Sequence, residues 1–132
     1  MEPYHWQVGQ DRLLEIPVTT MPGFKTPFHF SYLAYLARFS ETLMKAYLRV
    51  ALAACRLTGT QPSFLLHPLD VIGGDQAPEL RFFPGMDIPS ERKTRLLIDV
   101  LRIMQRHYEL VPMSVHAADI RSRISLPARV PA

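Results

Sequence analysis

The spacing of hydrophobic positions changes near residue 31. Residues 12–18 form a short apolar run with a proline at its end, which is typical of a strand because proline is tolerated where a sheet ladder stops. Apolar residues then recur every three to five positions over residues 31–57, which predicts helix. Ser40 is a suitable N-cap with Glu41 in the first turn, so the pattern allows one long helix or two helices joined near Ser40. Gly59 is suited to end the helical segment.

The second half of the chain repeats this change of pattern. Residues 63–67 are an apolar run between prolines and predict a short buried strand. Residues 68–89 are rich in proline and glycine and predict a long irregular loop, a feature that is often functional in compact domains. Ser90 is the expected N-cap of the next helix, and residues 108–112 predict a third strand. A short helix over residues 114–121, capped by its serine, completes the series.

This order of elements alternates strand with helix. Such alternation predicts an α/β fold with a parallel sheet, in which three strands leave both sheet edges open. The chain therefore reads as about three βα units from the end of a larger fold, or as half of one. We expect one folded unit over residues 1–121 and a disordered tail over residues 122–132, which carries prolines and arginines but no acid.

The composition of the chain excludes several classes of protein. The chain has 132 residues, of which 48% are hydrophobic and 20% charged, so it is not disordered by composition. Its 15 basic and 12 acidic residues give a net charge of +3 with scattered basic positions, which does not indicate a nucleic-acid partner. The single cysteine, Cys55, excludes an internal disulfide and is interpreted as a packed thiol. We see no secretion leader and no spanning apolar run, so the expected location is the cytoplasm.

His67 is the strongest candidate for chemistry, at the end of the expected buried strand. Catalytic groups of parallel α/β folds collect at that end of the sheet, and imidazole exchanges protons near neutral pH. The alternative is a structural histidine that is only hydrogen-bonded. Asp70 is suited either to orient the imidazole or to cap its own turn, and the turn role is slightly favoured. No metal-ligand spacing joins the other histidines, and three of them receive no site role: His29, His107 and His116.

Three segments resemble the C-terminal part of the polysaccharide deacetylase family, the NodB-homology fold. Residues 14–19, Leu-Glu-Ile-Pro-Val-Thr, resemble a late strand of that barrel. The run Leu65-Leu66-His67-Pro68 resembles the last motif of the family, a leucine, any residue and a histidine. Residues 92–116 resemble the final unit, in which a helix and a short strand precede a Ser-Val-His phrase.

The resemblance implies a distorted (β/α) barrel of the carbohydrate esterase type, a hydrolase that removes the acyl group from N-acyl amino sugars. A divalent metal, commonly zinc, activates water in that family. Carried over to this chain, the resemblance gives His67 the role of general acid and places Leu65 in the wall of the acyl pocket. The metal ligands and the catalytic base belong to motifs of the first half of the barrel, which this sequence does not contain. We therefore expect no metal ligand here, and no activity from this chain alone.

The expected partners follow from the same resemblance. They are a carbohydrate, with a lipid-linked amino sugar as the second candidate, and either a missing N-terminal half of the barrel or a second copy of the chain. The sequence then represents a truncated reading frame or a fragment. The alternative function is a non-catalytic remnant that binds a partner through its open sheet edge and its apolar helix.

Overall fold

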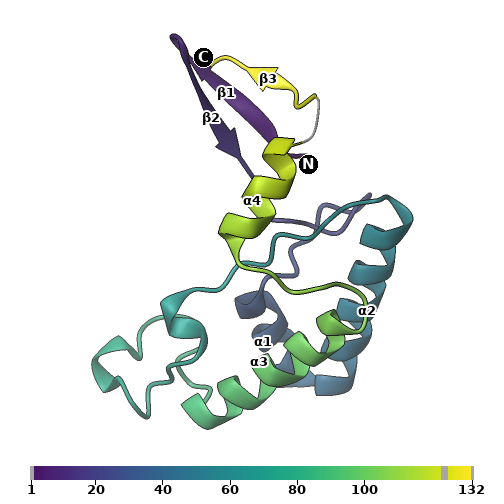
Figure 1. The fold of residues 1–132 in the computed structure, drawn as a ribbon. Coiled ribbons are helices and arrows are strands. Elements are labelled where there is room, and N and C mark those ends of the chain that lie inside the picture. Colours follow the sequence, from purple (N-terminus) through teal and green to yellow (C-terminus); the bar gives the residue numbers. More distant parts are fainter. Residues whose placement is uncertain (1, 123–124, 132) are drawn as a thin grey trace.

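The computed structural model describes residues 2–122 and 125–131, which form a mixed α/β structure with four α-helices and a three-stranded sheet. The strands are β1 (Tyr4–Val8), β2 (Asp11–Glu15) and β3 (Ala128–Arg129). The helices are α1 (Phe30–Phe39), α2 (Glu41–Leu57), α3 (Ser90–Gln105) and α4 (Met113–Ser122). Figure 1 shows α1, α2, α3 and a long loop as one body, with α4 leading from it toward the sheet.

The helical segment expected over residues 31–57 is two helices, which confirms the second of the two alternatives. Ser40 separates them with an extended backbone, at φ −162° and ψ 121°. Its hydroxyl accepts a hydrogen bond from the Leu43 N–H at 3.2 Å, so it caps α2. The backbone N–H of Ser40 still bonds to the Leu36 carbonyl and ends α1. Gly59 follows α2 with φ +68°, a conformation that suits glycine.

The core lies between α1, α2 and α3, and their apolar faces meet in one cluster. Burial of each Phe or Leu side chain contributes about 1.5–3 kcal/mol, so this cluster is the main source of stability. Cys55 belongs to it as a buried free thiol, which confirms its expected packing role, and burial raises the pKa of that thiol. The largest of its fully buried side chains are Phe28, Phe30, Leu33, Met44, Leu48, Leu52 and Val100.

The expected parallel sheet with helical crossovers is wrong. The observed order is β2-β1-β3, with β1 antiparallel to β2 and parallel to β3. A two-residue turn joins β1 to β2, and Gly9 in that turn has φ +61°. Trp6 Nε1 on β1 donates to Glu15 Oε2 on β2 at 2.6 Å. The first strand was not predicted because its residues mix polar and apolar side chains without a clear period.

The strands expected over residues 63–67 and 108–112 do not form in the described residues. Residues 63–67 are extended but make only isolated backbone bonds, from Thr19 N to the Ser63 carbonyl and from Phe30 N to the Leu65 carbonyl. A strand requires a continuous neighbour that exchanges hydrogen bonds along its length. Burial of these runs is also incomplete, since Leu66, Leu110 and Val111 are exposed, so an apolar run by itself predicts neither a sheet partner nor full burial.

Part of the tail expected to be disordered is a strand. Within residues 122–132, Ala128–Arg129 forms β3, and the Pro127 carbonyl accepts a hydrogen bond from His5 N at 2.9 Å. The Arg129 guanidinium lies over the Tyr4 ring, 3.9 Å from its centroid. Pairing with β1 and this cation–π contact hold the segment, and neither is visible in local sequence. Residues 123, 124 and 132 lie outside the described residues.

The long loop over residues 68–89 is confirmed, with two short 3-10 turns, η1 (Pro68–Asp70) and η2 (Pro78–Leu80). Ser90 is not the N-cap of α3, because it is the first helical residue after Pro89. Its hydroxyl instead donates to Asp75 Oδ1 at 2.9 Å and accepts from Gly73 N at 2.8 Å. These bonds attach residues 73–75 of the loop to the first residue of α3. None of the described helices is long and apolar enough to span a membrane.

Candidate functional site

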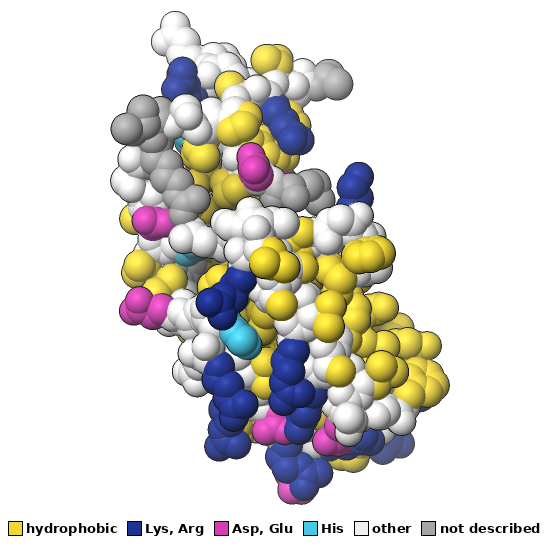
Figure 2. All heavy atoms as spheres, turned by 90° about the vertical axis from the view of Figure 1, so that its right-hand side faces the viewer, with side chains coloured by type: hydrophobic (Ala, Val, Ile, Leu, Met, Phe, Trp, Pro, Cys, Tyr) yellow, Lys and Arg dark blue, Asp and Glu magenta, His cyan; other side chains and the backbone are white. Residues whose placement is uncertain are grey.

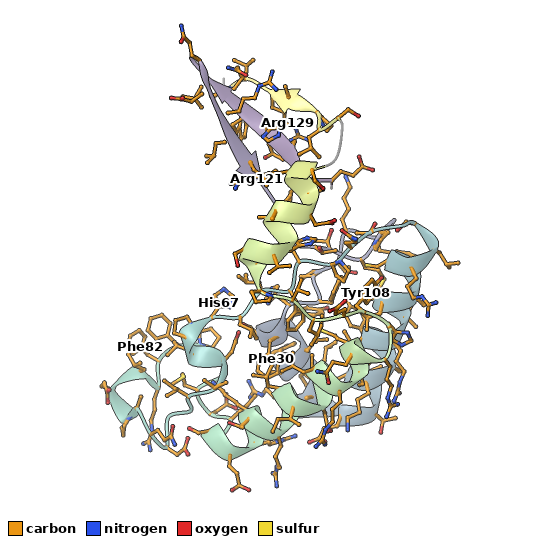
Figure 3. The ribbon with its side chains drawn as sticks, viewed as in Figure 1. Phe30, His67, Phe82, Tyr108, Arg121 and Arg129 are labelled. Atoms are coloured by element: carbon orange, nitrogen blue, oxygen red, sulfur yellow. The ribbon has the colours of Figure 1, made fainter. Side chains whose placement is uncertain are left out.

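His67 lies where the extended segment turns into the long loop, next to α1 (Figure 3). A tight turn fixes its backbone, because His67 N donates to Asp70 Oδ2 at 2.6 Å and Asp70 N donates to the His67 carbonyl at 3.0 Å. Pro68 starts the turn with a φ that proline prefers. Asp70 is buried, whereas the side chain of His67 is 49% exposed. The expected strand end is therefore replaced by a turn that presents the imidazole at the surface.

Ser31 of α1 connects the imidazole to the buried carboxylate. Its hydroxyl donates to Asp70 Oδ1 at 2.7 Å and lies 3.0 Å from His67 Nδ1. A hydroxyl has one hydrogen, so Nδ1 must donate to the Ser31 oxygen while that hydrogen points to Asp70. This assignment leaves Nε2 as the ring nitrogen that is free to face a ligand. Asp70 Oδ2 is 3.6 Å from Nδ1, so the buried carboxylate also faces the ring directly.

His29 is a second imidazole at this site. Its ring centroid lies 5.9 Å from that of His67, with the ring planes at 82°. The Nδ1 atom of His29 is buried and has no hydrogen-bond partner among the described residues. Burial lowers the pKa of His29, the neighbouring His67 lowers it further, and Asp70 acts in the opposite direction. The surroundings of His29 therefore favour its neutral form.

The shifted pKa of His29 predicts a loss of stability in mild acid. The unfolded chain binds a proton at this imidazole near its ordinary pKa of 6.5, while the folded chain resists protonation. The contribution is thus complete above pH 6.5 and is lost as the pH falls through the lower folded-state pKa. Urea unfolding near pH 7.5 and near pH 5.5 should show a smaller acid-dependent loss for His29→Gln than for the unmodified chain. His67→Gln, which removes the neighbouring imidazole, should also reduce the loss, and an equal loss in all three chains would contradict the assignment.

An apolar cavity of about 490 Å³ opens beside His67, between α1 and the long loop. Most of its walls are aliphatic and aromatic, and the polar side chains that line it are Ser31, Arg38, His67, Asp70 and Lys93. An apolar cavity with a few convergent polar groups is the usual form of a small-molecule site. Other residues that line it are Phe30, Ala34, Tyr35, Leu69, Phe83 and Ile88.

A second cavity of about 590 Å³ lies on the other side of the extended segment, between residues 61–66, the end of α3 and α4. His116 lines this cavity, and its Nε2 atom is buried without a hydrogen-bond partner in the described part of the chain. We place the candidate site at His67, where Ser31 joins the imidazole to a buried carboxylate.

The structure brings together some of the residues expected from sequence and leaves one apart. His67 and Asp70 are in one network, and Asp70 both forms the turn and faces the imidazole, so its two alternatives are compatible. Leu65 is only partly buried and is not among the residues that line either cavity, so its role in an acyl pocket stays a prediction. Ser31 was missed, because it lies 36 positions from His67 and belongs to no local motif.

The metal implied by the resemblance does not fit the described residues. Residues 2–122 and 125–131 contain no group of three or more His, Cys, Asp or Glu side chains arranged to hold a metal ion. His29, His67 and Asp70 approach one another, but Asp70 is occupied by Ser31 and by its own turn.

Comparison of the chain with protein-family models, curated proteins and solved structures finds no match.

Proposed function

We propose that the His67 site serves the hydrolysis of the amide bond in N-acyl amino sugars, with His67 as the general acid. One observation carries the proposal: the buried Asp70 and Ser31 hold Nδ1 of a half-exposed imidazole beside an apolar cavity. A general acid requires a fixed orientation and one nitrogen free to face substrate, and Nε2 meets both conditions. The Leu-x-His motif at residues 65–67 supports the same role by its resemblance to the polysaccharide deacetylases.

The proposed step moves one proton from His67. A water oxygen bonds to the acyl carbon and gives one proton to a base outside the described residues, the carbon–nitrogen bond breaks, and the leaving nitrogen takes the Nε2 proton. The imidazole is then neutral, and its contact with Ser31 keeps Nδ1 in place during the transfer. In this proposal the described residues supply the acid, and the group that activates the water is not among them. No step is assigned to a metal, since the described residues do not fit one.

We further infer that residues 14–19, 63–67 and 92–116 correspond to the closing units of a deacetylase-type barrel. The extended backbone of residues 63–67 supports this inference, as does the position of His67 at the end of that segment. In such a barrel the extended segments would gain strand neighbours on their open sides. The apolar lining of the cavity beside His67 suits an acyl chain or the lipid part of a lipid-linked amino sugar.

The chain is expected to bind an N-acyl amino sugar at His67. Titration with N-acetylglucosamine trimer or N-octanoylglucosamine should move the His67 ring signals in NMR spectra and reach saturation, with tighter binding for the octanoyl sugar because its chain fills the cavity. His67→Asn should weaken this binding. The matched change His116→Asn, in the other cavity, should leave it unaltered. The absence of a saturable change at His67 with both sugars would contradict the proposal.

Catalysis separates the enzyme from the alternative, a non-catalytic binding remnant. Any amide turnover by the chain should fall about 100- to 10,000-fold in His67→Asn, as is typical for loss of a general acid. The loss should shrink for amides with better leaving amines, which need less protonation. Sugar binding without any turnover, with or without added zinc, would support the remnant.

A further inference from the structure

The outer face of α2 carries an apolar row that nothing in the described structure covers. Leu43, Val50 and Leu57 follow one another at intervals of seven residues and are 54%, 59% and 89% exposed. Ala46 and Ala53 are exposed between them, which completes a row spaced like the seam of a coiled coil. The opposite face of α2 is buried in the core, so the helix is apolar on two sides. A helix that is apolar on two sides is normally covered on both of those sides.

A basic edge runs beside this row. Lys45, Arg49 and Arg56 lie on the flank of α2 that faces α3, as the helical period places them. Lys45 pairs with Asp99, whereas Arg49 and Arg56 form no ion pair with any described residue. Arg56 Nη1 lies 3.4 Å from His107 Nδ1, at the end of α3. Figure 2 shows basic side chains gathered beside an apolar area on this side of the molecule.

We propose that the outer face of α2 binds the surface of a membrane that contains anionic lipids. Helices that lie in the membrane interface combine an apolar row with flanking arginines and lysines, and the apolar row enters the boundary between headgroups and acyl chains. The row from Leu43 to Leu57 extends for about 21 Å, at about 1.5 Å per residue. Arg49 and Arg56 would then face the lipid phosphates.

Charge favours a lipid surface over a second copy of the chain. Two α2 helices packed antiparallel about Val50 would bring the two Arg49 side chains together and would place Arg56 near Lys45 of the second copy. Like charges at close range destabilise such a pairing. Phosphate headgroups instead complement the same arginines. This inference is independent of the proposed hydrolysis, since it uses none of the residues around His67.

Sedimentation with lipid vesicles tests the proposal on the full chain. Binding is expected to vesicles of phosphatidylcholine with about 30% phosphatidylglycerol, and to weaken strongly without the anionic lipid or in high salt. The double change Arg49→Gln with Arg56→Gln should weaken binding about 25-fold, or about fivefold for each arginine. Val50→Asp should abolish it, because a carboxylate then lies in the centre of the apolar row. The matched control is Leu13→Asp on β2, which is 63% exposed and lies outside the row.

Several results would overturn the proposal. These are equal binding to neutral and anionic vesicles, no binding to either, or loss of binding in Leu13→Asp to the same degree as in Val50→Asp. Sedimentation equilibrium without lipid tests whether a second copy of the chain covers this face instead. A dimer that dissociates in Val50→Asp would assign the face to self-association. Circular dichroism should give the same helix content for all variants, and the arginine double variant, which alters no buried group, keeps the test valid if an aspartate variant fails to fold.

Discussion

A Lys93→Met chain is expected to lose about 3–4 kcal/mol of unfolding free energy, because it removes the amine that fastens the long loop to α3. Lys93 is only 4% exposed, and its Nζ donates to the Leu69 carbonyl at 2.8 Å and to the Ile72 carbonyl at 2.7 Å. Burial lowers the pKa of Lys93, and the nearby Asp70 opposes that effect. Methionine fills similar volume but leaves both carbonyls without their donor. Urea unfolding near neutral pH measures the loss.

The matched control for this change is Lys45→Met on α2. Lys45 Nζ lies 2.6 Å from Asp99 Oδ2, a shorter contact than either bond of Lys93, but both partners are about one-third exposed. Ion pairs with this exposure contribute about 0–1 kcal/mol. The difference between the two losses of unfolding free energy therefore separates the effect of burial from that of charge pairing. Equal losses would show that the Lys93 bonds have no special role in holding the loop.

Gly73→Ala is expected to cost about 3 kcal/mol or more through steric conflict within the same loop. An alanine Cβ at this position would stand 2.4 Å from the Ile88 carbonyl oxygen and 2.8 Å from Ser90 N. Both are backbone atoms, so no side-chain rotation relieves the contact. It would also meet Asp75 Oδ1, the acceptor of two Ser90 bonds. Thermal unfolding, read by circular dichroism, should show a large decrease in the melting temperature.

Gly59→Ala provides the comparison for that change. Gly59 has φ +68°, but a Cβ added there meets nothing within 4 Å. The cost is then backbone strain alone, about 1 kcal/mol. A Gly59→Ala loss as large as that of Gly73→Ala would contradict the steric explanation. The Gly73 change should also alter the cavity beside His67, since the displaced loop forms one of its walls.

The sequence by itself determined the helices and the position of the long loop. The period of apolar residues in α2 and α3 and the Ser40 cap are local features, and each depends on residues within one or two turns. It also identified His67 and Asp70 as a pair, because the two residues share a turn three positions long. The pair could be expected near one another in any fold that keeps this turn.

Only the tertiary structure decided the sheet and the rest of the candidate site. The apolar runs over residues 63–67 and 108–112 are only partly buried and do not become strands, because a strand depends on a neighbour that donates and accepts hydrogen bonds along its length. Such neighbours are present for β1, which pairs with β2 and β3. Ser31 and His29 reach His67 across more than 35 positions of sequence through the packing of α1. Contacts at that separation follow from how elements pack and not from any spacing along the chain, which is why the sequence contained His67 and Asp70 together but not the hydroxyl that connects them.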